Sequence, residues 1–442
     1  MAVEIKPATS IQEAIALCAP DEPLPAGDPR WQDFSQVRGV ALADKINRRL
    51  ESYTAAGRYA YVALAGHRGC GKSTELYRVK HRAEQSGYLV LYTRVDEELD
   101  PYDVDYSDLL LLISRLVEEA FREEGMPLDS RTLDHIARWF MEVTRIEETQ
   151  VEASLGVRGE LEAKVELPFF AKLMVALTSG IRAGGKSKTE IRETVQRYPK
   201  ALVDNVNLLM DDAYKALKRR GKKGLLLIFD NLDRYRPEIA DKLLLQSADI
   251  LKGVHCNAIY TVPISLIYDP LGDRVRERFL PEILPMIAVR HRNGSPNEEG
   301  IGCMMGALRK RLEVESVFES EELARRLILM SGGCIRDLMY LIQEACLVAA
   351  EKIDEEAAEW SIRWVRADLS RGIQARYYPL LAGISLTKNA PGDKDHRKIL
   401  FHRYALEYEG ERWADVHPLI EGIREFQDAL AEERKKRGIE VG

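Results

Sequence analysis

Short apolar runs alternate with helical spacing in the first part of the chain. Tyr59–Ala65 and Tyr88–Arg94 have the length and composition of buried strands. A glycine-rich turn follows the first run and leads into helical spacing from Lys72 to Ser86. Strand, turn, helix and strand in this order form a βαβ unit, which indicates a parallel sheet. The expected fold class is therefore α/β.

Later runs predict the rest of this sheet. Leu225–Phe229 is an apolar strand that ends in Asp230, and Ala258–Val262 is another. Glu282–Val289 is expected to be the last core strand. Helical spacing over residues 40–54, 106–145 and 191–219 predicts helices beside the sheet.

An insertion of about residues 98–200 interrupts the expected core. Residues 151–167 alternate apolar with polar side chains and predict a polar β-hairpin, followed by an apolar segment at Pro168–Leu177 and a basic turn at Arg182–Lys188. The amphipathic piece Phe169–Ile181 has the composition of a membrane-surface helix, but packing against a partner subunit is the favoured interpretation.

The remaining segments predict four domains. Residues 1–58 form an N-terminal arm and first helix, with Pro20–Pro29 extended, and residues 59–297 form the core. Residues 298–353 are expected to be a helical lid. Residues 354–442 give three helices and a hairpin, Tyr404–Tyr408 with Arg412–Val416, which is the order of a winged-helix domain.

Composition excludes several function classes. The 442 residues are 45% apolar and 31% charged, with a net charge of −7, which argues against a protein that coats nucleic acid by bulk charge. No apolar run approaches the length of a membrane span, so stable membrane insertion is not expected. Six scattered cysteines form no Cys-x-x-Cys pair, which predicts buried thiols in a reducing, cytoplasmic compartment.

A phosphate-binding loop is the strongest motif in the chain. Gly66-His-Arg-Gly-Cys-Gly-Lys-Ser73 matches G-x-x-x-x-G-K-[ST] between a predicted strand and a predicted helix. Glycines let backbone N–H groups surround a phosphate, Lys72 reaches the β- and γ-phosphates, and Ser73 is a ligand for Mg²⁺. The residues expected to bind nucleotide here are Gly66, His67, Arg68, Gly69, Cys70, Gly71, Lys72, Ser73 and Thr74.

A second motif supplies carboxylates. Asp230 ends an apolar strand, where it is expected to help hold Mg²⁺ beside the phosphate loop. Asn231 follows, where many hydrolytic relatives of this motif have Glu, and an amide cannot accept a proton near neutral pH. Asp233 is the nearest substitute base, and a helix cap is its structural alternative. If Asp233 is only a cap, hydrolysis is expected to be slow.

These motifs resemble the AAA+ and STAND group of P-loop NTPases, within it origin-recognition-type ATPases and bacterial ATPases linked to antiphage defence. The resemblance implies ATP with Mg²⁺, a sensor role for Thr261, and a lid arginine, Arg336, in Gly332-Gly-Cys-Ile-Arg336. It also implies an adenine-pocket turn at Arg38. An arginine finger acting in trans would come from Arg274, Arg276 or Arg278, although a solvated helix face is the favoured interpretation of that run, which alternates in charge.

The favoured function is an ATP-binding, slowly hydrolysing switch whose nucleotide state controls oligomerisation or the binding of an effector protein. By resemblance, its setting is antiphage defence. One alternative is an initiator-type ATPase that binds DNA through the winged helix; the acidic wing at Glu407, Glu409 and Glu411 argues against it. Another is a scaffold with a structural nucleotide.

Overall fold

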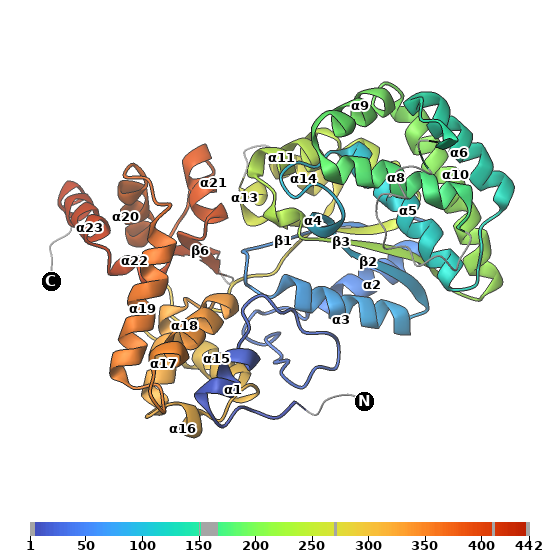
Figure 1. Cartoon of the computed structure of the whole chain (residues 1–442). Helices are drawn as coiled ribbons and strands as arrows, with labels where there is room; N and C mark the ends of the chain where they lie inside the picture. The colour runs from blue at the N-terminus through green and yellow to red at the C-terminus, as the bar shows by residue number, and fades with distance from the viewer. Residues whose placement is uncertain (1–4, 150, 152–166, 269–271, 409–411, 439–442) are drawn as a thin grey trace.

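A parallel sheet of five strands forms the centre of this computed structural model (Figure 1). The structure describes residues 5–149, 151, 167–268, 272–408 and 412–438. The core strands are β1 (Tyr61–Gly66), β2 (Tyr88–Arg94), β3 (Gly224–Asp230), β4 (Asn257–Pro263) and β5 (Leu280–Ile283). Their order is β2-β3-β4-β1-β5, and every pair is parallel. The mixed α/β fold with a parallel sheet is confirmed.

Helices cover both faces of this sheet, and alternate residues of each strand face opposite layers. Val62 and Leu64 pack with the first layer, α2 (Leu42–Ala55) and α3 (Lys72–Gln85). Ala63 and Ala65 pack with the second layer, which includes the insertion helices. Strands buried on both faces need near-continuous apolar sequence, as β3 and β4 have.

The insertion between β2 and β3 is a block of helices on the face of the sheet opposite α2 and α3 (Figure 1). It contains α4 (Val95–Glu98), α5 (Tyr106–Glu123), α6 (Ser130–Thr144), α8 (Phe169–Ala183), α9 (Gly185–Val195) and α10 (Pro199–Arg219). The predicted basic turn is shorter than expected: the chain turns at Gly184, between the end of α8 at Ala183 and the start of α9 at Gly185, and most of the predicted range is helical. The predicted hairpin lies, apart from its ends, outside the described residues. The apolar side of α8 is buried against α5 and α6.

Short elements follow β3 and lead to the last core strand. They are η1 (Leu232–Arg234), α11 (Pro237–Asp241), η2 (Lys242–Gln246), α12 (Ala248–Lys252), α13 (Ile264–Ile267) and α14 (Gly272–Arg278). The strand predicted at Glu282–Val289 is shifted, since β5 ends at Ile283. Residues 284–289 are mostly buried, but they pass beneath the lid and tail instead of extending the ladder with β1.

The lid consists of α15 (Glu298–Arg309), α16 (Val314–Val317), α17 (Glu321–Met330) and α18 (Ile335–Val348). A helix that the sequence pattern did not predict, α1 (Ile11–Leu17), packs on α18. Ser10 caps α1 by accepting a hydrogen bond from the N–H of Glu13. The N-terminal arm is therefore joined to the lid.

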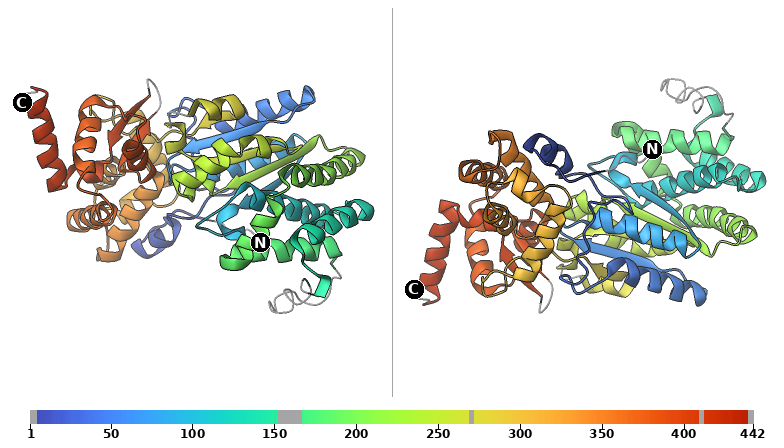
Figure 2. Two further views of the ribbon diagram at one scale, coloured as in Figure 1. Left: turned by 90° about the horizontal axis from the view of Figure 1, so that it is seen from above. Right: turned by 90° about the horizontal axis from the view of Figure 1, so that it is seen from below.

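The tail contains α19 (Glu355–Ser370), α20 (Tyr377–Thr387), α21 (Lys394–Phe401), β6 (Ala405–Tyr408), β7 (Trp413–Val416), α22 (Pro418–Glu421) and α23 (Arg424–Lys436). β6 and β7 are antiparallel, as a winged helix requires. Figure 2 shows the tail at one end of the molecule, beyond the lid. Among the described helices, none has the length and apolarity to span a bilayer.

Candidate nucleotide site

The phosphate loop lies between β1 and α3, at the carboxyl end of the sheet. Gly71 precedes α3 with a φ of +98°, a backbone conformation that favours glycine. A Cβ on Gly69 would lie 2.7 Å from Arg336 Cβ and 2.9 Å from Cys334 Sγ. The lid therefore touches the loop directly, and only glycine allows that approach.

Lys72 forms a buried ion pair with Asp233. Lys72 Nζ lies 2.9 Å from Asp233 Oδ2 and donates to the carbonyls of Gly66 (2.8 Å) and His67 (2.7 Å). Burial raises the pKa of Asp233, but the charges of Lys72, Arg68 and Arg234 together outweigh burial and leave that pKa below its ordinary value. Both side chains are therefore charged, and the lysine of the phosphate loop contacts the second carboxylate of the Asp230–Asp233 motif.

Asp230 ends β3 and is held from two sides. The Tyr92 hydroxyl donates to its Oδ2 (2.6 Å), and the Asn231 N–H donates to its Oδ1 (2.8 Å). Burial, together with the Asp230 charge, raises the pKa of Tyr92. Tyr92 therefore stays a hydroxyl donor and fixes the orientation of the carboxylate.

Thr261 lies beneath this motif. Its hydroxyl accepts a hydrogen bond from the Leu232 N–H (3.0 Å) and donates to the Phe229 carbonyl (3.3 Å). Thr261 does not line the pocket beside the phosphate loop. In this structure its contacts support the turn that carries Asp233.

One pocket of about 1020 Å³, including its open mouth, brings most of the predicted residues together. Of the predicted nucleotide-binding residues, it is lined by Arg38, Arg68, Gly69, Gly71, Lys72, Ser73 and Thr74. Asp230, Asp233 and Arg336 line it as well, whereas Gly66, His67 and Cys70 do not.

The N-terminal arm closes the far side of this pocket. The Leu24 N–H donates to Thr74 Oγ1 (3.1 Å), so that hydroxyl holds the arm. Arg38 is buried, and its guanidinium donates to the Cys70 carbonyl and stacks over Phe34. Arg336 Nε lies 3.1 Å from Asp21 Oδ1 instead of pairing with Asp337. The arm thereby satisfies the lid arginine.

Unpartnered donors in the pocket fit an anionic ligand. Nε of Arg38 and of Arg68 is buried without a hydrogen-bond partner in the described part of the chain. Buried polar groups usually have a partner, and arginine matches phosphate geometry. ATP would supply those oxygens, held by the loop and these arginines. Ser73 and Asp230 line the same pocket and are suitable oxygen ligands for Mg²⁺, which would neutralise phosphate charge.

The sequence analysis did not identify several residues that contribute to the site. Tyr92 and Arg94 come from β2, and Arg94 lines the pocket opposite Asp230. Asp21 comes from the arm, and Asp96 contacts Asn231 through a hydrogen bond of 2.7 Å. The capping residues Ser10 and Glu13 were the available signal for the folded arm. The others depend on tertiary contacts that spacing does not reveal.

The tail covers the outer side of the phosphate loop. His67 is buried, and its Nε2 accepts a hydrogen bond from the Glu407 N–H of β6 (2.8 Å). Burial, aided by the charges of Lys72 and Arg403, lowers the pKa of His67 to about 3. The Arg68 guanidinium lies over the ring of Phe401, 4.4 Å from its centroid. Two residues of the nucleotide motif therefore bind the winged helix.

The candidate arginine fingers lie on α14. Arg278 forms an ion pair with Asp249 (2.7 Å), and Arg276 is exposed. The Arg274 side chain is outside the described part of the structure. The assignment of a finger that acts in trans stays a prediction.

Sheet order, phosphate loop and carboxylate motif together define a P-loop nucleotide-binding fold. No family model and no curated protein matches the chain. Solved structures that align with it include Cdc6p from Pyrobaculum aerophilum, at 12% identity, over 95% of this chain and 98% of that one, with a TM-score of 0.39. ORC1 of Aeropyrum pernix in complex with DNA aligns at 13% identity, over 96% and 98%, with a TM-score of 0.40. A Walker-type ATPase of Pyrococcus abyssi aligns at 12% identity, over 91% and 98%, with a TM-score of 0.39.

Proposed function

We propose that the chain is an ATP-binding, slowly hydrolysing switch whose winged helix is docked on the phosphate loop in its closed state. The contact of His67 and Arg68 with the tail carries this proposal. A nucleotide that reorganises the loop must either accommodate these contacts or break them. The nucleotide state is thereby coupled to the position of the tail.

A buried ion cluster supports the same closed state. Asp337, at the start of α18, pairs with Arg403 (3.0 Å) and His417 (3.0 Å) of the tail. Arg403 Nη1 also donates to the Arg68 carbonyl (3.4 Å). Lid, tail and phosphate loop therefore meet at one point. Slow turnover is expected, because Asn231 cannot act as a base and Asp233 is engaged by Lys72.

The DNA-binding alternative is less well supported. On α21, the helix that precedes the hairpin of the tail, Arg397 donates to the Ser265 carbonyl (3.0 Å) and pairs with Asp241 (2.9 Å) of the core. Arg403, the last basic residue of that region, is bound to Asp337. Helix α21 also packs on α13, so Arg397 is occupied within the chain, whereas Lys394 on the same helix is exposed.

The wider setting is also a proposal. The effector-binding role, homo-oligomerisation and the antiphage setting rest on the resemblance of the motifs. A scaffold with a structural nucleotide would have the same pocket but no exchange. Exchange and turnover therefore separate the switch from the scaffold.

The test is ATP turnover and nucleotide content of the purified full chain. Lys72→Ala should abolish nucleotide binding, and Asp233→Ala should lower kcat by about 100-fold or more while nucleotide still binds, because it removes the proposed base. The exposed residues Lys222 and Asp211 give matched controls, Lys222→Ala and Asp211→Ala. A wild-type chain that binds no nucleotide contradicts the proposal, and bound nucleotide that never exchanges supports the scaffold.

A further inference from the structure

The segment that follows β2 connects the nucleotide pocket to the helical insertion. Arg94, the last residue of β2, is in register with Asp230 of β3. Val95, the first residue of the short helix α4, and Leu99, which follows that helix, are completely buried. The chain then runs through Asp100 and Asp103 into α5. Its two ends are thus fixed, one beside the nucleotide motif and the other inside the insertion.

Asp96 holds the turn that carries Asp233. The Asn231 side-chain amide donates to Asp96 Oδ1 (2.7 Å), and Arg234 Nη1 lies 3.1 Å from Asp96 Oδ2. Asn231 has a φ of +66°, in the left-handed region that is costly for residues with a side chain. Asn231 and Arg234 flank Asp233 on both sides, so one carboxylate fixes both ends of this turn.

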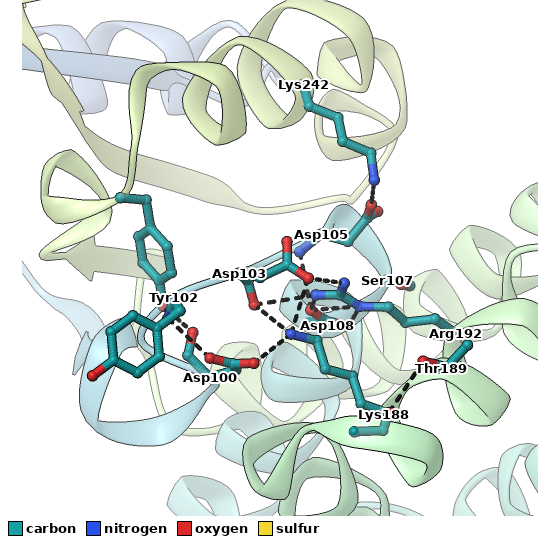
Figure 3. Close-up of polar contacts among 12 residues, drawn as sticks. Asp100, Tyr102, Asp103, Asp105, Ser107, Asp108, Lys188, Thr189, Arg192 and Lys242 are labelled. Carbon is teal, nitrogen blue, oxygen red and sulfur yellow. Dashed lines mark hydrogen bonds and ion pairs between the residues drawn. The ribbon is translucent and has the colours of Figure 1, made fainter.

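A cluster of charged side chains, shown in Figure 3, anchors the same segment to α9; Lys188 and Asp108 are buried, and Asp103 is half-buried. Lys188 Nζ lies 2.6 Å from Asp100 Oδ2 and 3.0 Å from Asp103 Oδ2, and it donates to the Asp103 carbonyl (2.9 Å). Arg192 pairs with Asp103 (2.5 Å) and with the fully buried Asp108. We call Asp100, Asp103, Asp108, Lys188 and Arg192 the anchor cluster.

The segment between β2 and α5 also contacts the chain that follows the Asn231–Arg234 turn. The Tyr235 hydroxyl donates to the carbonyl of Asp100, a member of the anchor cluster (3.0 Å), and Lys242 pairs with Asp105, which lies outside the cluster (2.5 Å). Breaking one partner of a buried ion pair is costly, because it leaves the other charge without compensation. If α9 is displaced, the 96–103 segment must therefore move with it or lose these ion pairs.

We propose that the insertion controls ATP turnover through Asp96, a positioning residue whose place is set by the anchor cluster. With α9 docked, Asp96 holds the Asn231–Arg234 turn and keeps Asp233 in position. Loosening α9 releases Asp96 and misplaces Asp233, which slows hydrolysis but leaves nucleotide binding intact. This inference rests on the proposed function and assigns the insertion as its regulatory element.

The first experiment compares steady-state turnover of full-length variants. Lys188→Met disrupts the anchor cluster, and Lys186→Met makes the same change at a lysine on α9 whose side chain is 90% exposed. We expect Lys188→Met and Asp96→Ala each to lower kcat by about tenfold or more, with KM changed by less than about twofold, because the group misplaced acts in the chemical step. Asp96→Asn keeps an acceptor for Asn231 and should recover part of the loss.

A variant that carries both changes distinguishes an effect of α9 that is transmitted through Asp96 from two independent defects. If Asp96 transmits the effect of α9, Lys188→Met causes no further loss in the Asp96→Ala background. Losses that multiply would overturn the proposal, as would a Lys188→Met variant that equals Lys186→Met.

Hydrogen exchange across residues 230–235 gives a second readout that needs no turnover. We expect faster exchange of these amides in Lys188→Met than in Lys186→Met, because the turn opens when Asp96 is released. Unchanged exchange overturns this inference while leaving the proposed switch intact. A wild-type chain without bound nucleotide would instead remove the proposed function on which the inference rests.

Discussion

At the scale of single residues, the site contains oppositely charged side chains that pair with one another. Lys72 neutralises Asp233, and Asp21 lies beside Arg336 in the same pocket. A nucleotide phosphate would compete with both carboxylates for these cations. The carboxylates of Asp233 and Asp21 thus take the place of part of the nucleotide phosphate. They compensate the charges of Lys72 and Arg336 when the phosphate is not bound.

His67 makes the contact between loop and tail sensitive to pH. Its folded pKa of about 3 lies below the ordinary value of 6.5, so the unfolded chain binds the proton more readily. Stability is therefore lost as pH falls from about 6.5 toward about 3. Lowering the pH from about 7.5 to about 5.5 should cost the wild type roughly 1 kcal/mol more than His67→Gln, whose amide does not titrate.

Urea unfolding of both proteins at the two pH values measures that difference. The other histidines are present in both chains, so their titration cancels in the comparison. Equal losses in the two proteins would contradict the neutral, buried state of His67.

At the scale of elements, the sequence predicted the strands and helices whose position depends on the local pattern of apolar and polar residues. β2 and the start of α3 lie where the apolar run and the phosphate loop indicated, because a buried parallel strand needs continuous apolar sequence. The strand at Glu282–Val289 was misjudged, since burial beneath the lid also selects apolar residues. The partners of Arg336 and Arg397 could not be predicted, because Asp21 and Asp241 are brought to them only by tertiary packing.

The junction between α18 and the tail should dominate the stability of the closed form. Asp337→Ala leaves the buried Arg403 without its carboxylate, which should cost about 3–5 kcal/mol. Asp368→Ala, at an exposed carboxylate on α19, is the matched control and should change stability by less than about 0.5 kcal/mol. Denaturant unfolding midpoints measure both. Equal midpoints for the two variants would argue against a stabilising ion cluster at this junction.

At the scale of the whole molecule, the tail is placed so that α21 faces the core. Because Arg397 is bound to Asp241, the protein as purified should bind duplex DNA weakly, with a shallow dependence on salt. Binding is measured by anisotropy of a labelled duplex over a range of salt concentrations. A steep slope that Lys394→Ala and Lys398→Ala together abolish would contradict the docked position of α21 in solution.

The bridge between the segment that enters the lid and strand β6 of the tail has a consequence for the rate at which the protein opens. Met286, which leads from the core into the lid, forms a parallel bridge with Tyr408 of β6, and Leu419 of the tail packs in the lid core. Lid and tail consequently cannot swing separately without breaking this shared core. One opening motion would limit both the escape of nucleotide and the exposure of α21, so the two events should have the same rate constant in wild type and in every variant that alters it.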